Sequence, residues 1–369
     1  MKKSRTFSRL TLIWTRITNG KPMLIAIDAR CRGSEHIRQN KPLQDFSGST
    51  SDRWKSYAYA LIADGHGGEK YFRSEHGSRI AVLCAVEEIN KVLKDLLFHI
   101  KKKEVDVIDK SLNNLCAKIL LSWREKVCAH FSEHPLTEDE RKQCEALKIT
   151  LPILEEEIPT LYGSTLLSAA YFEKFEFWFA LQIGDGKTVA IRETATSYYQ
   201  QRPQNGGKRA AEIAISDDSS VFYPIPEDEE MGFGVTASLC GARAAEHFFY
   251  SFGFGRLGGI AVMSDGLTDS FDKDKLPDFI LNIQKNALAD RERTKGELEA
   301  FLPKLSEQGS GDDVSLAGVF MHDARQSDVE QCVGELGEYI KRGMKSLEKK
   351  IVLKQKDFSV NGNQLKNMK

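Results

Sequence analysis

Residues 57–68 read YAYALIADGHGG, and this stretch decides the fold class that we expect. The apolar run at residues 57–63 is typical of a short β-strand. Asp64 follows at once, next to three glycines and a histidine. Because glycine lets the backbone turn sharply, the Asp64 carboxylate would stand rigidly at the end of a strand. A single Asp-Gly pair is most often a plain turn, so a functional reading depends on whether the pattern recurs.

The pattern recurs downstream, at Asp185 in IGDG, at Asp265 in SDG and at Asp312 in GDD. Another acid, Asp45, lies upstream in PLQDF. Hard cations such as Mg²⁺ and Mn²⁺ take oxygen ligands from carboxylates, carbonyls and water. Carboxylates that converge at one end of a sheet would repel one another unless cations neutralised them. The sequence therefore predicts a divalent-metal site built from these aspartates.

The rest of the chain alternates between strand and helix patterns. Strands are predicted at residues 22–29, 57–63, 164–172, 176–183, 188–192, 259–263 and 314–320. The short connections at 173–174 and 185–186 predict hairpins and hence antiparallel pairing. Apolar residues at steps of three and four predict helices at 78–97 and 327–351, and further helical segments are expected near 236–249, 274–288 and 294–306.

The length of 369 residues allows one large domain with insertions. We predict a main domain over residues 1–325, followed by a C-terminal helix and a polar tail over 326–369. Within the main domain, residues 101–158 are charge-rich and predicted to be mostly helical. Residues 196–230 are rich in Gln, Ser, Asp, Gly and Pro, which predicts a loop or flap.

Composition narrows the class of protein. The chain is 41% hydrophobic and 28% charged, as expected for a folded domain, and its net charge of -1 gives no electrostatic reason to expect nucleic-acid or membrane partners. No apolar run is long enough to span a bilayer, and the one at residues 10–13 is too short for a signal peptide, so a cytoplasmic location is expected. Seven cysteines without a C-x-x-C spacing predict reduced thiols rather than a zinc site.

Five motifs, taken in order, resemble those of protein phosphatase 2C, the metal-dependent serine/threonine phosphatase family, and most closely its bacterial branch. They are ADGHGG at 63–68, YGSTLLSAAY at 162–171, IGDGKTVAI at 183–191, MSDGLTDSF at 263–271 and GSGDDVSLAGVF at 309–320. HIRQNKPLQD at 36–45 matches the lead-in of the bacterial branch. The resemblance implies an α+β fold, in which a central antiparallel β-sandwich is flanked on both sides by helices in four αββα layers.

The resemblance also implies a site with two divalent cations, Mg²⁺ or Mn²⁺, and a third, weaker one. By position, the implied metal ligands are Asp64, which would bridge two cations, the carbonyl of Gly65, Asp265 and Asp312, with Asp45 holding metal-bound waters and Asp185 the third cation. His66 matches the histidine proposed as general acid for the leaving alkoxide. Phosphoserine and phosphothreonine in proteins would be hydrolysed by metal-activated water, without a phospho-enzyme. The partner would be a phosphorylated protein, in a signalling pathway that opposes a serine/threonine kinase.

Some positions depart from the family pattern or have no assigned role. The departures are Asp313 where Asn is usual, Gly186 where Ser is common, Thr268 where an aromatic residue is common, and Gln44 where many eukaryotic members carry an acid. The phosphate-binding arginine is not placed, with Arg30, Arg32 and Arg38 as candidates. Surface or structural roles are expected for His36, His76, His247 and Ser164.

Two alternatives remain open at this point. The chain could be a weak or inactive phosphatase-like regulatory protein, although such proteins usually lose metal aspartates, and here all are present. It could also be a phosphoesterase that acts on small phosphorylated molecules.

Overall fold

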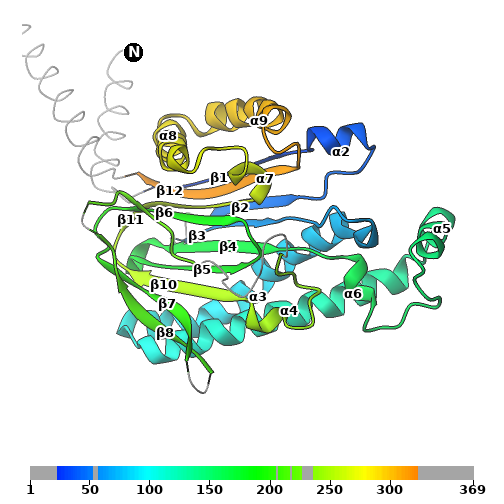
Figure 1. Cartoon of the computed structure of the whole chain (residues 1–369). Helices are drawn as coiled ribbons and strands as arrows, with labels where there is room; N and C mark the ends of the chain where they lie inside the picture. The colour runs from blue at the N-terminus through cyan, green and yellow to red at the C-terminus, as the bar shows by residue number, and fades with distance from the viewer. Residues whose placement is uncertain (1–22, 53–56, 205–206, 217, 227–235, 323–369) are drawn as a thin grey trace, which may run out of the picture. The chain divides into compact units, whose positions relative to one another are not determined.

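The computed structural model describes residues 23–52, 57–204, 207–216, 218–226 and 236–322 (Figure 1). The chain divides into two units, Leu24–His322 and a unit made of Met1–Met23 with Asp323–Lys369. The predicted helix at 327–351 and the polar tail lie outside the described residues, and the predicted boundary near residue 325 stays a prediction.

Strands of the described residues form two sheets, and every strand pair whose register is defined is antiparallel. The seven-stranded sheet has the order β2 (Phe46–Asp52), β3 (Tyr57–Ala63), β4 (Leu166–Phe172), β5 (Phe177–Ile183), β10 (Phe249–Phe254), β7 (Ser197–Gln204) and β8 (Gly207–Ala214). The five-stranded sheet has the order β1 (Met23–Cys31), β12 (Val314–His322), β11 (Leu257–Met263), β6 (Lys187–Arg192) and β9 (Val221–Phe222).

The two sheets pack face to face, and β3 shows how the sequence builds this sandwich. Ala58 and Ala60 belong to the apolar core between the sheets. Tyr59 and Leu61 belong to the core on the other face of the same strand. Because side chains alternate along a strand, a strand buried on both faces reads as a continuous apolar run. This explains why β3 is recognisable from sequence at its observed bounds.

Helices cover the outer face of each sheet (Figure 1). The helices α3 (Ser74–Lys102) and α4 (Val105–Glu133) pack on the seven-stranded sheet, and α8 (Leu276–Ala289) and α9 (Arg291–Gln308) pack on the five-stranded sheet. The prediction of a four-layer αββα fold is therefore confirmed. The short helices are α2 (Ser34–Arg38), α5 (Glu138–Ala146), α6 (Ile158–Leu161) and α7 (Asp265–Thr268), with 3₁₀ turns at η1 (Glu69–Tyr71), η2 (Glu173–Phe175), η3 (Ala244–Glu246) and η4 (Lys273–Lys275).

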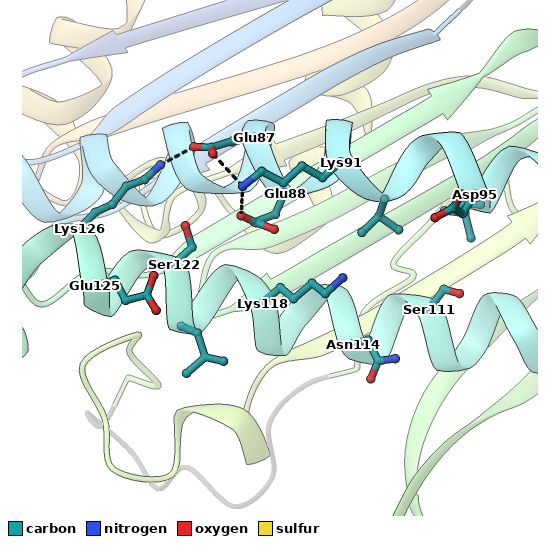
Figure 2. A pocket seen from close by; sticks show the side chains of 13 residues that line it. Glu87, Glu88, Lys91, Asp95, Ser111, Asn114, Lys118, Ser122, Glu125 and Lys126 are labelled. Atoms are coloured by element: carbon teal, nitrogen blue, oxygen red, sulfur yellow. Dashed lines mark hydrogen bonds and ion pairs between the residues drawn. The ribbon is translucent and has the colours of Figure 1, made fainter.

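The charge-rich segment 101–158 is helical as predicted, with α4 and α5 accounting for most of it. One face of α4 is buried against α3 and the sheet, and the indole of Trp123 is fully buried there and donates a hydrogen bond to the Gly77 carbonyl at 3.0 Å. The opposite faces of α3 and α4 border a groove lined by charged side chains (Figure 2). Lys91 pairs there with both Glu87 and Glu88 at 2.8 Å. The groove contains none of the predicted site residues.

The predicted hairpin at Asp185-Gly186 is wrong. β5 pairs with β4 and β10 in the seven-stranded sheet, whereas β6 pairs with β11 and β9 in the five-stranded sheet. The turn instead carries the chain from one sheet to the other. Gly184 has a positive φ of 119°, and a Cβ on Gly186 would lie 2.4 Å from the Met263 carbonyl oxygen, so both glycines are needed for the crossing. Short connections favour hairpins within one sheet, and here the sandwich overrides that preference.

Two further expectations are corrected. The segment 196–230 is not simply a loop, because β7 and β8 form a hairpin at the edge of the seven-stranded sheet and β9 joins the other sheet. Its polar residues fit an edge position, where buried Gln200 donates to the Pro224 carbonyl at 2.9 Å. The helix expected at 236–249 is also wrong, since only η3 forms there and β10 begins at Phe249.

None of the helices in the described part of the chain combines the length and the apolar character that a membrane crossing requires. The described cysteines are free thiols: Cys31, Cys84, Cys116, Cys128, Cys144 and Cys240.

Candidate metal centre

Strand register brings the predicted acids to one edge of the sandwich. β2 and β3 pair with Phe46 opposite Ala63, so Asp45 and Asp64 flank the same end of this strand pair. β11 and β12 pair with Met263 opposite Leu316, which places Asp265 and Asp312 at the corresponding end in the other sheet. Antiparallel pairing thus joins residues that are far apart in sequence.

Asp45 is the acid whose surroundings are least compatible with an isolated negative charge. Only 3% of the residue is exposed, and neither carboxylate oxygen has a hydrogen-bond partner among the described residues. Burial raises the pKa of Asp45 well above its ordinary value, and the charges of Asp313, Asp265 and Asp312 raise it further, whereas the neighbouring Ser315 hydroxyl lowers it. A buried carboxylate with so few donors around it is a group that fits a nearby cation or its water ligands.

Asp64 and Asp265 form the centre of the cluster. Burial of the Asp64 carboxyl group, together with the charges of Asp45 and Asp265, raises its pKa well above the ordinary value. Burial raises the pKa of Asp265 to about 6, with further contributions from the charges of Asp185 and Asp312. The two carboxyl groups lie close enough for each to shift the pKa of the other. Divalent cations would remove the repulsion between the carboxylates, so the donor set fits hard cations.

The backbone around Asp64 is held rigidly. Its N–H donates to Thr165 Oγ1 at 2.9 Å, and its carbonyl accepts from the Thr165 N–H at 2.8 Å. Gly65 is buried, and a Cβ there would lie 2.7 Å from the carbonyl oxygens of both Gln44 and Ser74. Only glycine therefore fits next to the central aspartate.

Two of the predicted ligands are more exposed than the central acids. The Asp312 side chain is 50% exposed. Asp185 is exposed as well, and it accepts a short hydrogen bond from the Thr236 hydroxyl. Its charge contributes to the raised pKa of Asp265, which places Asp185 at the edge of the cluster.

His66 follows Asp64 by two residues and packs against an aromatic residue. Its ring is 4.8 Å from that of Tyr71, measured between centroids. Burial lowers the pKa of His66 to about 4, while the charge of Asp185 acts in the opposite direction and that of Lys70 lowers it further. The imidazole is therefore neutral near pH 7 in the metal-free and substrate-free protein.

A family model described as Protein phosphatase 2C matches residues 32–303. The chain belongs to the protein phosphatase 2C family. No relative is found among curated proteins.

Several solved structures resemble this protein phosphatase 2C chain. One is PppA, described as a key regulatory component of T6SS in Pseudomonas aeruginosa, with 12% identity, a TM-score of 0.43 and coverage of 81% of this chain and 98% of that chain. Another is the catalytic domain of the serine threonine protein phosphatase PstP in complex with two manganese ions, with 16% identity, a TM-score of 0.40 and coverage of 81% and 99%. The S. agalactiae serine/threonine phosphatase gives the same identity, TM-score and coverage.

Two departures from the protein phosphatase 2C pattern, Asp313 and Gln44, meet in the structure. Asp313 is buried, and its Oδ2 accepts the backbone N–H of Gln44 at 2.6 Å and that of Asp45 at 3.3 Å. Its Oδ1 accepts the N–H of Gly33 at 2.6 Å. An acid, which offers only acceptors, is therefore well suited to this position.

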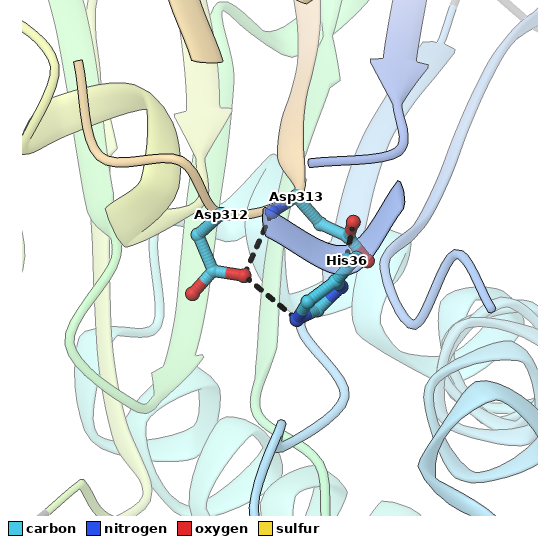
Figure 3. A group of neighbouring side chains, drawn as sticks. All are labelled: His36, Asp312 and Asp313. Atoms are coloured by element: carbon cyan, nitrogen blue, oxygen red, sulfur yellow. Dashed lines mark hydrogen bonds and ion pairs between the residues drawn. The ribbon is translucent and has the colours of Figure 1, made fainter. Parts of the chain in front are cut away.

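His36 was expected to have a surface or structural role. The structure buries it in contact with both Asp312 and Asp313 (Figure 3), which the sequence did not predict. Two features of the sequence concern this contact: His36 opens the lead-in motif, and Asp313 replaces the usual Asn. Neither feature by itself indicates that the two residues meet.

The arginine candidates differ in their surroundings. Arg38 is on the surface of α2 and pairs with Glu35 at 3.1 Å. Arg32 is exposed and donates to the Lys41 carbonyl at 3.3 Å. Arg30 lies 4.1 Å over the Phe46 ring, and burial lowers its pKa, whereas the charges of Asp28 and Asp45 raise it. Arg30 is thus the candidate whose charge reaches the acid cluster.

Surface or structural roles were also expected for Ser164, His76 and His247. The buried Ser164 hydroxyl donates to the Thr165 carbonyl at 2.9 Å. The His76 ring packs against the His130 ring, tilted by 35°, with 4.6 Å between ring centroids. His247 is buried.

Proposed function

We propose that the chain is a metal-dependent protein serine/threonine phosphatase that hydrolyses phosphoserine and phosphothreonine in proteins. The observation that supports this most is the convergence of Asp45, Asp64 and Asp265, whose pKa values are all raised by burial and mutual repulsion. Clusters of this kind occur at functional sites. Family membership supports the reaction class, and the cluster offers the oxygen donors that we propose for the metal ions.

The proposed ligands of Mg²⁺ or Mn²⁺ are the carboxylates of Asp64, Asp265 and Asp312 and the carbonyl of Gly65. Asp45 would accept hydrogen bonds from water around the cations, and Asp185 would help to hold a third, weaker cation. When bound, the cations would neutralise the phosphoryl charge and acidify a water molecule.

His66 is proposed to donate a proton to the serine or threonine oxygen as the phosphorus–oxygen bond breaks. Because its pKa is about 4 in the free protein, this role requires the phosphate dianion to raise that pKa on binding. The products are inorganic phosphate and the free hydroxyl, and no covalent enzyme intermediate is involved. The expected partner is a phosphorylated protein, and the opposing enzyme a serine/threonine kinase.

The first prediction tests this function directly. The full chain should hydrolyse a phosphothreonine peptide with Mn²⁺ or Mg²⁺ and lose activity in EDTA. Asp64→Asn should abolish turnover, because it removes the central charge that two cations would share, while circular dichroism stays unchanged. Asp139→Asn, on an exposed side chain of α5, is the matched control and should keep full activity.

Two results would contradict the proposal. Full activity in EDTA or in Asp64→Asn would mean that the aspartates do not hold catalytic metals. Turnover of small phosphate esters without turnover of phosphopeptides would favour a small-molecule phosphoesterase. Absence of turnover with both substrates would favour a regulatory protein.

A further inference from the structure

His36 is anchored on one side and faces a metal-ligand candidate on the other. Its side chain is 9% exposed, and its Nδ1 lies 2.9 Å from Asp313 Oδ1 (Figure 3). Its Nε2 lies 3.4 Å from Asp312 Oδ1. Asp313 cannot turn away easily, because its oxygens also accept the N–H groups of Gly33 and Gln44. The ring is therefore held with Nε2 directed at Asp312.

This arrangement suits a metal-binding imidazole. When Nδ1–H donates to a carboxylate, the lone pair on Nε2 is left free for a cation. Two ligand atoms about 2.1 Å from one cation, at angles of roughly 90° to 110°, lie about 3.0 to 3.4 Å apart. The separation of 3.4 Å between His36 Nε2 and Asp312 Oδ1 fits this range.

A second observation points to the same place. The side-chain oxygen of Gln44 is buried and has no hydrogen-bond partner among the described residues. The amide orientation is defined, because its Nε2 donates to the His66 carbonyl oxygen at 3.1 Å. A Cβ on Gly67 would lie 3.5 Å from His36 Nε2 and 3.8 Å from Gln44 Oε1. Both atoms therefore border the same space beside Gly67, and both offer a lone pair.

We propose that this space binds a divalent transition-metal ion through His36 Nε2 and Asp312, with Gln44 Oε1 as an additional donor. The mixed nitrogen and oxygen ligands favour Mn²⁺, Fe²⁺ or Zn²⁺ over Mg²⁺. Lys41, which donates to the Gly67 carbonyl at 2.9 Å, brings a positive charge nearby. Asp312 and Asp313 together outweigh it. The site shares Asp312 with the proposed metal centre, but it does not depend on phosphatase activity.

The experiment measures metal binding rather than turnover. The full chain is stripped with a chelator, titrated with Mn²⁺ by calorimetry and studied by pulsed electron paramagnetic resonance. Wild type should show hyperfine coupling of Mn²⁺ to an imidazole nitrogen, and labelling with ¹⁵N-histidine should change the coupling. His36→Asn can still donate to Asp313 but lacks Nε2. It should lose the coupling and weaken one Mn²⁺ site about 10- to 100-fold, while Mg²⁺ binding changes little.

Controls separate this site from its neighbours. The hyperfine coupling should persist in His66→Ala. It should also persist in His76→Asn, because His76 pairs with Glu75 away from the acid cluster. It should also persist in Asp64→Asn, so failure of the proposed function leaves this result unaffected. If His36→Asn does not fold, His36→Gln supplies an oxygen in place of the nitrogen and should equally lose the coupling. Absence of coupling in wild type, or coupling that survives loss of His36, would show that the space holds water or a proton only.

Discussion

Asp45 and His66 show that a residue's role depends on surroundings that lie far away in sequence. Asp45 looks like an acid in a polar turn, yet it is almost fully buried against Asp313 and near Asp265. His66 looks like a typical histidine next to an aspartate, yet burial lowers its pKa to about 4. Both residues are unfavourably placed without a bound cation or substrate, which is expected at a functional site.

A second prediction concerns His66 alone. If His66 protonates the leaving oxygen, His66→Ala should slow hydrolysis of a phosphothreonine peptide by roughly 10² to 10⁴. Hydrolysis of an activated aryl phosphate, whose leaving group needs no proton, should change much less. The measurement is kcat on both substrates at saturating Mn²⁺. Equal losses on the two substrates would mean that His66 only packs against Tyr71.

At the scale of elements, the turn between β5 and β6 brings an exposed acid to the edge of the site. It carries Asp185, which is linked to Thr236, the first residue described after 227–235. The turn crosses between the sheets, so its position is set by both of them.

The third prediction therefore concerns Asp185. Asp185→Ala should raise the Mn²⁺ concentration needed for half-maximal activity, because a site with few protein ligands binds loosely. Calorimetry should show the loss of one weak site, with the tighter ones still filled. Thr236→Val removes the hydroxyl that donates to Asp185 and should have a smaller effect in the same direction. An unchanged number of bound metals and an unchanged activity curve would make Asp185 an ordinary turn residue.

The helix α5 is attached to the start of α3 by an ion pair between buried Arg73 and partly buried Glu140. Arg73, with 5% of its side chain exposed, donates to Glu140 at 2.7 and 2.9 Å, and its Nη1 donates to the His134 carbonyl at 2.8 Å. Glu140 also completes the capping box of α5 with Thr137. The segment that contains α5 is thereby attached to the residues just after the DGHGG turn.

As a fourth prediction, Glu140→Gln should destabilise the protein by about 3 kcal/mol, because it leaves the buried Arg73 charge without its partner. Urea unfolding measures the loss. Asp139→Asn, in an exposed pair with Lys142, should change stability by less than about 1 kcal/mol. Equal effects of the two changes would mean that the Arg73–Glu140 pair does not hold α5.

At the scale of the whole described unit, metal binding and protonation compete. The pKa of Asp265 is raised to about 6, and those of Asp45 and Asp64 are raised too. Between the ordinary pKa of an aspartate and about pH 6, Asp265 binds more protons in the folded, metal-free protein than in the unfolded chain, and the raised pKa values of Asp45 and Asp64 act in the same direction. The metal-free fold therefore becomes more stable as pH falls toward the pKa values that these acids have in the unfolded chain. It becomes less stable as pH rises. His66 and His130, whose pKa values are both lowered to about 4, act in the opposite direction.

The fifth prediction concerns the difference in stability between metal-loaded and metal-free protein at each pH. The contribution of the distant His130 to stability largely cancels in this difference. Mn²⁺ at a hundred times its Kd should stabilise the fold by about 2.7 kcal/mol near pH 7.5. The gain should shrink at pH 5, where protons occupy the carboxyl groups. The rise in Tm between EDTA and Mn²⁺ measures it. A gain that is equal at both pH values would mean that the metals bind elsewhere.

Much of the fold could be predicted from sequence alone. The run at residues 57–63 is apolar because β3 is buried on both faces, and the steps of three and four in α3 follow from packing one face on the sheet. The same patterns failed where polar residues occupy an edge hairpin, as in β7 and β8, because local composition cannot distinguish an edge strand from a loop.

The sequence by itself predicted most of the strands and helices and the order of the acidic turns, through apolar periodicity and the glycines beside the aspartates. The sandwich followed from the resemblance of the motifs to those of protein phosphatase 2C. Only the tertiary structure decided that β5 and β6 belong to different sheets, that Asp45 is buried without a donor, and that His36 meets Asp313 across most of the chain. The reason is physical: burial, pKa and ligand geometry depend on which groups pack together in three dimensions, and strand register across two sheets sets that packing.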